Sequence, residues 1–197
     1  MQKREARVAR KTNETDIEAA ICLDGRGTAQ VDTGVPFFDH MLSAFARHGL
    51  FDLEVRAQGD LEVDAHHTVE DVGIVLGQAV AQALGDKRGI TRMAHAAVPM
   101  DEALVLSALD LSGRGGLYWA MDVPIGAIQT FDTQLGREFF GAFALNAAAT
   151  LHVQQLAGEN AHHLLEAAFK ALGRALSAAV AIDPRVEGQL PSTKGAL

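Results

Sequence analysis

The chain has 197 residues, 48% of them hydrophobic, which is long and apolar enough to bury a core. Its 25 acidic and 17 basic residues leave a net charge of −8, which argues against a nucleic-acid or anionic-membrane surface, although local cations can still bind a small anion. A single cysteine, Cys22, excludes an internal disulfide and is typical of a reducing compartment. We expect a cytoplasmic protein, because the N-terminal segment lacks a signal-peptide core and no stretch reaches transmembrane length.

The residue pattern in the first half of the chain predicts alternating strands and helices. In chain order the elements are a strand at Ile17–Leu23 closed by a Gly-rich turn, a strand at Thr28–Asp32, a helix over 38–48, a strand over 50–57 and a helix over 65–84. Gly85 ends the last helix. Strands and helices in this order are typical of an α/β (α+β, two-layer) fold, in which helices cover one face of a sheet.

The second half repeats this order. Its elements are strands at Leu104–Leu111 and Leu117–Val123, a helix over 135–147, a strand over 149–156 and a helix over 161–180. Three blocks recur in sequence: LDGRG at 23–27 as LSGRG at 111–115, residues 40–55 as 138–153, and AHHTVED at 65–71 as AHHLLEA at 161–167. We therefore expect one pseudo-symmetric, internally duplicated domain, with 1–92 and 93–187 as repeats and 188–197 as a C-terminal arm.

A His-His-x-x-Glu motif opens the last helix of each half. At about 100° per residue, His66 and Glu70 lie about 40° apart, and His67 and Glu70 about 60° apart, so either histidine can share a metal ion with the glutamate. The two histidines themselves diverge by about 100°, which favours binding to two different ions. The second motif has the same geometry in His162, His163 and Glu166. One such pair is a weak signal, but two copies at matching places of a repeat predict a metal site.

The repeat adds one further candidate ligand to each half. His40 precedes the first motif, and the ungapped alignment places Glu138 at the matching position of the second half. Imidazole and carboxylate ligands without thiolate favour an octahedral divalent ion, Mn²⁺ before Fe²⁺ or Zn²⁺. We expect Asp39, Asp64 and Asp71 to accept hydrogen bonds from the imidazoles and so to orient them.

Basic residues beside turns predict an anion site. Arg92 follows Gly89-Ile90, Arg114 lies in the LSGRGG turn, and Ser192, Thr193 and Lys194 offer hydroxyls and an ammonium on the Gly-flanked arm. Lys170 follows Glu166 by four residues, so it fits either this site or an ordinary ion pair along a helix.

Five segments closely resemble imidazoleglycerol-phosphate dehydratase of histidine biosynthesis, in its single-function form: FFDHMLSAFARHGLFDL, DAHHTVEDVGIVLGQA, MDEALVLSALDLSGR, LHVQQLAGENAHHLLEAAFKALGRAL and PSTKGAL. The resemblance implies two halves, each a four-stranded sheet with two helices on one face. It implies a homo-oligomer of 24 subunits with active sites between subunits, and two Mn²⁺ ions bound at each site by the HHxxE helices. It also implies a phosphate held at Arg92, Arg114, Ser192 and Lys194. The implied reaction removes water from D-erythro-imidazole-glycerol phosphate to give imidazole-acetol phosphate.

The family comparison leaves the proton-transfer groups open. Glu14 is our candidate for acid–base chemistry or ring positioning, and the repeat matches it with Glu102. His48 and Asp101 are further candidates, and the alternative for each is a structural hydrogen bond. Some members of the family carry His where this chain has Glu138, so we expect a retained site with an altered metal affinity or metal preference.

Two other functions are compatible with these residues. A dinuclear metallohydrolase would use the same ligands to release inorganic phosphate from a phosphoester. A metal-storage oligomer would also need histidines, but the phosphate clamp on the arm argues against it. A ferritin-like di-metal bundle conflicts with the strand-rich repeat and with the HHxxE ligand order.

Overall fold

The structure is a computed structural model that describes residues 3–195. The first half contains β1 (Glu5–Lys11), β2 (Thr15–Cys22), β3 (Ala29–Asp32), α1 (Pro36–Gly49), β4 (Asp52–Gly59) and α2 (His66–Leu84). The second half contains β5 (Met93–Met100), β6 (Ala103–Asp110), β7 (Gly116–Ala120), α3 (Leu135–Asn146), β10 (Thr150–Ala157) and α4 (Ala161–Val180). A short hairpin, β8 (Ala127–Ile128) and β9 (Phe131–Asp132), precedes α3, and a 3₁₀ turn, η1 (Pro184–Val186), follows α4.

The two sheets have the same topology. Their strand orders are β1-β2-β4-β3 and β5-β6-β10-β7. Neighbouring strands are antiparallel except for the last pair of each sheet, β3 with β4 and β7 with β10, which run parallel and are joined through a helix. This arrangement confirms the predicted fold class of two duplicated halves, each a four-stranded sheet with two helices.

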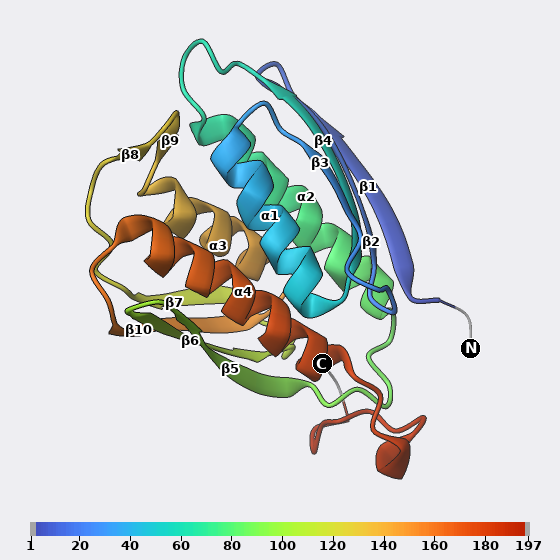
Figure 1. The fold of residues 1–197 in the computed structure, drawn as a ribbon. Helices are drawn as coiled ribbons and strands as arrows, with labels where there is room; N and C mark the ends of the chain where they lie inside the picture. The colour runs from blue at the N-terminus through green and yellow to red at the C-terminus, as the bar shows by residue number, and fades with distance from the viewer. Residues whose placement is uncertain (1–2, 196–197) are drawn as a thin grey trace.

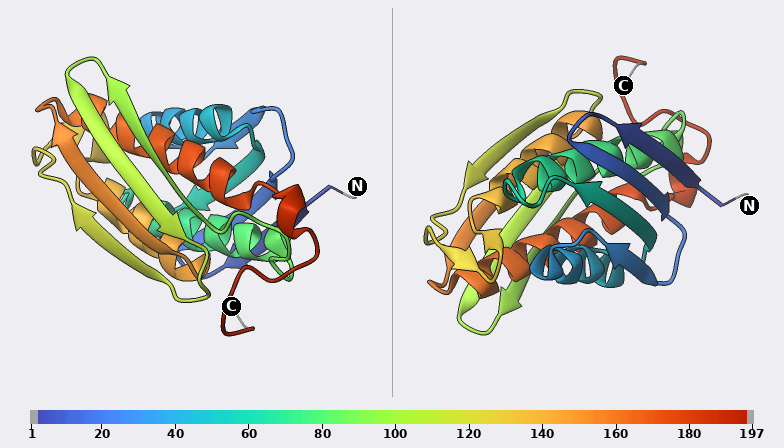
Figure 2. Two further views of the ribbon diagram at one scale, coloured as in Figure 1. Left: turned by 90° about the horizontal axis from the view of Figure 1, so that it is seen from below. Right: turned by 90° about the horizontal axis from the view of Figure 1, so that it is seen from above.

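The helices lie between the sheets (Figure 1). Helices α1 and α2 cover the inner face of the first sheet, and α3 and α4 cover that of the second. Across the middle, α2 packs against α3 and α1 against α4, as the two further views also show (Figure 2). Buried phenylalanines fill this space, among them Phe38, Phe45, Phe139 and Phe169. The halves therefore share one hydrophobic core, and α1 lies beside a helix of the other half.

Glycines allow the helices to approach closely. A Cβ atom on Gly173 of α4 would lie 2.4 Å from the carbonyl oxygen of Phe45 in α1. At the repeat-related position in α2, a Cβ atom on Gly77 would lie 2.7 Å from the carbonyl oxygen of Phe143 in α3. Both distances are shorter than any ordinary contact, so a side chain at either position would push the helices apart.

We expect Gly173→Ala to lower the free energy of unfolding by about 1–3 kcal/mol, because an overpacked helix contact must shift its backbone. Urea unfolding followed by circular dichroism would measure the change. Gly126→Ala is the control, since a Cβ atom there meets nothing within 4 Å. Equal urea midpoints for the two variants would contradict this account of the helix contact.

The residue patterns alone missed the first strand of each sheet. Both β1 and β5 are edge strands. Charged side chains, such as Arg7 and Lys11, interrupt the apolar signal of β1, and β5 is rich in alanine and contains Pro99, which edge strands tolerate. The hairpin β8–β9 lies between the strand and the helix predicted for the second half, where no strand was predicted. No helix between residues 3 and 195 has both the length and the apolar character needed to span a membrane.

Candidate metal and phosphate sites

Short capping bonds hold both histidine pairs in the first turn of their helices. The Asn160 side chain accepts hydrogen bonds from the backbone N–H groups of His162 at 2.9 Å and His163 at 3.2 Å. Before α2, the Asp64 carboxylate accepts from the backbone N–H of His66 at 2.7 Å. The predicted role of Asp64 in orienting an imidazole ring is therefore wrong, because its carboxylate is engaged with the backbone at the start of the helix.

Three candidate ligands converge where α1 meets α4. Ligand atoms of His40, His162 and Glu166 all lie within 4.8 Å of one another. The Oε2 atom of Glu166 is 3.1 Å from Nε2 of His162 and 3.5 Å from Nε2 of His40. Two imidazole nitrogens and a carboxylate oxygen form a donor set that suits a divalent transition ion. The residues present thus fit the metal that the sequence predicts.

Glu166 is held in its ionised form. Its side chain is only 8% exposed, and burial opposes the negative charge. The hydrogen bond and the charge of Lys170, whose Nζ lies 2.6 Å from Oε1, outweigh that effect, so the pKa of Glu166 is lowered. In the described structure Lys170 thus makes the helix ion pair that was one of its two predicted roles. Its second contact is with Sδ of Met100 at 3.4 Å.

The other histidine of each pair faces a different set of carboxylates. Nδ1 of His163 is 2.7 Å from Oε2 of Glu102, and Nδ1 of His67 is 3.0 Å from Oδ2 of Asp60. The neighbouring rings are nearly perpendicular, at 90° for His66 and His67. The divergence predicted from helix geometry is therefore present, and each helix offers its two imidazoles to two different places.

These carboxylates shift the titration of the histidines. The hydrogen bond that His163 donates to Glu102 raises the pKa of His163 and lowers the pKa of Glu102 to about 2. The hydrogen bond that His67 donates to Asp60 raises the pKa of His67, with a smaller contribution from the charge of Glu14, whose Oε2 is 3.9 Å from Nδ1 of His67. Glu14 and Glu102, matched by the sequence repeat, thus occupy matching places beside the two histidines.

The counterpart of the His40 group is not assembled in the first half. Nε2 of His66 is 3.7 Å from Oε2 of Glu70, and that glutamate is 46% exposed. Glu138 of α3 is exposed and belongs to no three-ligand group within residues 3–195. The two groups differ in charge: Glu70 and Glu138 are two carboxylates, which repel each other when no cation lies between them, whereas the imidazole of His40 does not repel Glu166. Ile74 also stands where the second half has Lys170.

Two more predicted orienting groups have other partners. Asp39 accepts hydrogen bonds from the backbone N–H and the hydroxyl of Thr33, at 2.9 and 2.6 Å. Asp71 is paired with Arg10 at 3.0 Å and with the Thr15 hydroxyl. Both predictions are wrong because these contacts come from other segments of the fold, which helix spacing does not reveal. The carboxylates that face His67 are Glu14 and Asp60, and those that face His163 are Asp101 and Glu102.

The C-terminal arm folds back onto Arg92. The guanidinium of Arg92 bonds to both oxygens of Asp110 at 2.7 and 3.0 Å, and its Nη1 donates to the carbonyl oxygen of Pro191 at 2.7 Å. This contact brings Ser192, Thr193 and Lys194 into the neighbourhood of Arg92, as an anion site requires. The last two residues of the predicted arm, 196 and 197, lie outside the described residues.

Two other basic residues, Arg114 and Lys87, differ from Arg92 in their exposure and contacts. Arg114 is exposed on the turn after β6, where its backbone N–H and guanidinium contact Ser112. Lys87, which the sequence analysis missed, donates to the carbonyl oxygen of Leu111 at 3.2 Å, and burial lowers its pKa. Lys87 has a φ of 59° and Arg92 a φ of 74°, values that are rare outside glycine and that could not be read from the sequence.

Two predicted proton-transfer residues lie at different distances from the ligands. Asp101, in the turn between β5 and β6, has its Oδ2 atom 3.6 Å from Nε2 of His163. His48 is eight residues beyond His40 on α1, a rise of about 12 Å. Burial, followed by the charges of Lys170 and Arg174, lowers the pKa of His48.

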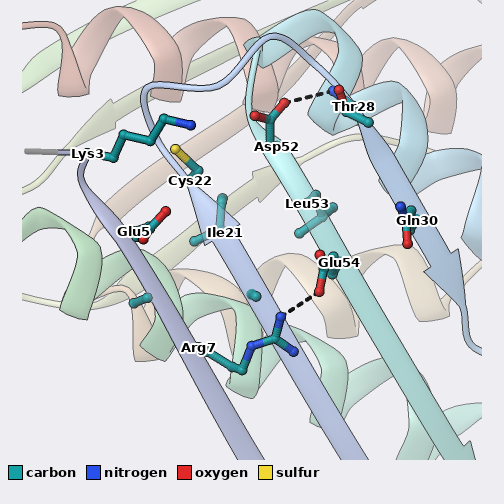
Figure 3. A pocket seen from close by; sticks show the side chains of 12 residues that line it. Lys3, Glu5, Arg7, Ile21, Cys22, Thr28, Gln30, Asp52, Leu53 and Glu54 are labelled. Atoms are coloured by element: carbon teal, nitrogen blue, oxygen red, sulfur yellow. Dashed lines mark hydrogen bonds and ion pairs between the residues drawn. The ribbon is translucent and has the colours of Figure 1, made fainter.

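A hollow of about 560 Å³ lies elsewhere, on the outer face of the first sheet (Figure 3). Charged side chains line it, including Lys3, Glu5, Arg7, Asp52 and Glu54. The sheet lies between this hollow and the helices that carry the histidines, so the candidate metal ligands do not line the hollow.

The fold and the site together define a class: a duplicated α/β protein whose paired helices begin with histidine–carboxylate metal ligands. The family model of imidazoleglycerol-phosphate dehydratase matches residues 33–176. Imidazoleglycerol-phosphate dehydratase of Moorella thermoacetica is 61% identical over 194 residues, covering 98% of each chain. That of Desulforamulus reducens is 59% identical over 197 residues, covering both chains fully.

Solved structures agree with these relatives. Imidazoleglycerol-phosphate dehydratase of Staphylococcus aureus has a TM-score of 0.82 at 36% identity and covers 91% of this chain and 99% of its own. The enzyme of Pyrococcus furiosus has the same TM-score at 39% identity and covers 96% of this chain and 100% of its own. The chain belongs to the imidazoleglycerol-phosphate dehydratase family. It is a dehydratase, and therefore a hydro-lyase, of histidine biosynthesis.

Proposed function

We propose that the chain removes water from D-erythro-imidazole-glycerol phosphate to give imidazole-acetol phosphate, with Mn²⁺ as the metal and in the cytoplasm. The observation that carries this proposal is the convergence of His40, His162 and Glu166 from two halves of the chain. This donor set is suited to a divalent ion, and the arm beside Arg92 is suited to a phosphate.

Two ions would share eight candidate ligands. His40, His162 and Glu166 would hold one ion, and His66, Glu70 and Glu138 would hold the other. When bound, the ions would act as Lewis acids on the imidazole ring of the substrate. Because His67 and His163 face away from these groups, we propose that each completes a site on a neighbouring subunit of a homo-oligomer of about 24 chains.

The phosphate would bind between the basic groups near the arm. Arg92 is held in place by Asp110 and by the carbonyl oxygen of Pro191, so little side-chain freedom is lost on binding. Ser192, Thr193 and Lys194 would add hydroxyl and ammonium donors. Arg114, on its exposed turn, would contact the phosphate of a neighbouring subunit.

We assign proton transfer to carboxylates beside His67 and His163, the second histidines of the two motifs. Glu14 and Asp101 are the candidates, because their oxygens lie 3.9 Å from Nδ1 of His67 and 3.6 Å from Nε2 of His163. Glu102 bonds directly to His163, and we assign it the positioning of that ring. We give His48 no part in proton transfer, since it lies about 12 Å along α1 from His40.

The direct test is turnover of imidazole-glycerol phosphate by metal-stripped protein before and after addition of Mn²⁺, with the enolised product followed by absorbance. Product formed only with metal present would support the proposal. Release of inorganic phosphate in the same assay would instead support the metallohydrolase alternative. Unchanged turnover after stripping would exclude a metal role.

The two metal positions should differ in affinity, because within residues 3–195 only the His40 group has its ligand atoms brought together. Calorimetric titration of stripped protein with Mn²⁺ should resolve a tight and a weak class of site. We expect His40→Ala to remove the tight class and Glu138→Ala to leave it intact. Loss of the same class in both variants would contradict the assignment.

As the pH is lowered, the metal should be lost at a higher pH than an ordinary histidine ligand would give. A histidine must be neutral to bind a metal, and Glu102 raises the pKa of His163, so protons compete with the metal as the pH falls through that raised value. Glu102→Gln removes the carboxylate, and we expect the midpoint of metal loss to move to lower pH. Metal content measured after dialysis at a series of pH values checks this. A midpoint that stays in place would show that Glu102 does not control the titration.

A further inference from the structure

The two motifs hold their second histidine by carboxylates from different parts of the chain. In the second half, Oε2 of Glu102, in the β5–β6 turn, lies 2.7 Å from Nδ1 of His163. The sequence repeat matches Glu102 with Glu14, so a symmetric chain would place Glu14 against His67. Instead, the two carboxylate oxygens of Asp60 lie 3.0 and 3.3 Å from Nδ1 of His67, and Oε2 of Glu14 is 3.9 Å from it. Asp60 thus makes the contact in the first half that Glu102 makes in the second.

Two additional residues in the first half bring Asp60 to this position. Six residues, 60–65, lie between β4 and the first histidine pair, whereas four, 158–161, lie between β10 and the second pair. The longer segment begins directly against the first turn of α2, because a Cβ atom on Gly59 would lie only 2.1 Å from Oγ1 of Thr68. The residue that follows Gly59 is therefore held beside the histidines at the start of α2.

The backbone of Asp60 is fixed independently of its side chain. Its N–H donates to the carbonyl oxygen of Glu14 at 3.1 Å, and its carbonyl oxygen accepts from the N–H of Val63 at 2.8 Å. Both bonds remain when the side chain is replaced. A substitution at Asp60 therefore tests what the carboxylate does to His67, with the loop still attached.

The contact settles which nitrogen of His67 is left for a ligand. An ionised carboxylate can only accept a hydrogen bond, so the hydrogen lies on Nδ1 and the lone pair of Nε2 is left for a metal ion. Glu14, in contrast, is 56% exposed, and its carboxylate makes no hydrogen bond within residues 3–195. Of the two carboxylates matched by the repeat, Glu102 is occupied by a histidine and Glu14 is not.

We propose that Asp60 is a positioning residue, which holds the His67 ring in the place of Glu14 and thereby leaves the Glu14 carboxylate available to a substrate. The inference rests on the proposed function, in which His67 binds a metal ion and Glu14 transfers a proton. It assigns different roles to the two matched glutamates. Glu102 orients a metal ligand, whereas Glu14 is released from that role by the longer loop of the first half.

The test measures metal affinity, which does not depend on turnover. Stripped protein is titrated with Mn²⁺ by calorimetry, and His67→Ala identifies the class of site that His67 joins. We expect Asp60→Ala to weaken Mn²⁺ binding in that class by about 10–100-fold, as loss of a group that orients a metal ligand does. Asp60→Asn keeps an oxygen acceptor and should recover most of the affinity. Glu62→Ala removes an exposed carboxylate of the same loop and should bind Mn²⁺ as the wild type does.

Three results of this titration would overturn the proposal. They are wild-type affinity in Asp60→Ala, an equal loss in Asp60→Ala and Glu62→Ala, and an Asp60→Asn variant as weak as Asp60→Ala. The last result would show that the negative charge acts and the orientation of the ring does not.

The release of Glu14 is tested by combining substitutions. Glu14→Gln alone should leave the Mn²⁺ affinity unchanged, because Asp60 holds His67. In an Asp60→Ala background it should weaken Mn²⁺ binding several-fold further, because Glu14 is then the carboxylate nearest to the ring. Equal effects of Glu14→Gln in both backgrounds would contradict the inference.

A crystal structure of the metal-free Asp60→Ala variant gives a readout without any titration. We expect the His67 ring to turn so that Nδ1 approaches Oε2 of Glu14 from 3.9 Å to about 3 Å. A ring that stays in place would overturn the proposal. Absence of turnover with imidazole-glycerol phosphate would refute the proposed reaction and leave these affinities and distances unchanged, so the two failures are distinguishable.

Discussion

Glu166→Gln should abolish metal binding at the His40 group and reduce turnover by more than about 100-fold. The carboxylate provides the only negative charge in the group, and both imidazoles lie within 3.5 Å of its Oε2 atom. Substitution of groups that merely orient metal ligands already costs about 10–100-fold, so loss of a ligand should cost more. Metal content and turnover would be measured on the same preparation.

The substitution has a structural side effect that needs a control. It leaves the ammonium of Lys170, only 16% exposed, without its ion-pair partner. Glu166→Gln combined with Lys170→Met removes that unpaired charge, and Glu159→Gln tests an exposed carboxylate before the same helix. A double variant that folds but binds no metal would assign the loss to the ligand. Full activity in Glu166→Gln would reject the metal site.

Arg92→Ala should raise the KM for substrate by about 10–150-fold with a much smaller change in kcat. This range corresponds to loss of a charged hydrogen bond of about 1.5–3 kcal/mol that binds the phosphate equally before and during the reaction. Steady-state kinetics and competition by inorganic phosphate would measure both effects. A KM within two-fold of wild type would exclude Arg92 from the phosphate site.

Arg88→Ala is the matched control for Arg92. Both arginines anchor the arm through backbone carbonyl oxygens, Arg88 on Gly188 at 2.9 Å and Arg92 on Pro191 at 2.7 Å. If Arg92 only anchored the arm, both variants would raise KM alike. We expect Arg88→Ala to leave phosphate competition close to wild type, which separates binding of the anion from attachment of the arm.

The interior elements were predictable because their signals are periodic. The helix expected over 161–180 is observed over those residues, and the strand expected over 149–156 is observed as the interior strand β10, Thr150–Ala157. Edge strands β1 and β5 escaped the residue patterns because charge, alanine and proline mask the alternation of apolar residues. Of the predicted ligands, three converge in one chain, and the spacing that identified them depends only on helix geometry.

Contacts between segments far apart in the chain could not be predicted from the sequence. Nothing in the spacing of Asp60 and His67 distinguishes this pair from Asp64 or Asp71, since loops and packing decide which carboxylate reaches the ring. The unequal assembly of the two ligand groups was likewise invisible, because it depends on where Glu138 and Lys170 stand in three dimensions. Local geometry could be inferred from the residues, and tertiary geometry could not.

The pairing of α1 with α4 bears on how a chain of this kind could arise. His40 belongs to one half, and His162 and Glu166 belong to the other. A half-length chain that carried one copy of each motif would have no such triad by itself. It could form the triad only as a homodimer, in which each molecule contributed a histidine to the triad of its partner. Fusion of two such molecules would keep the triad while freeing each copy to change, as His40 and Glu138 now differ.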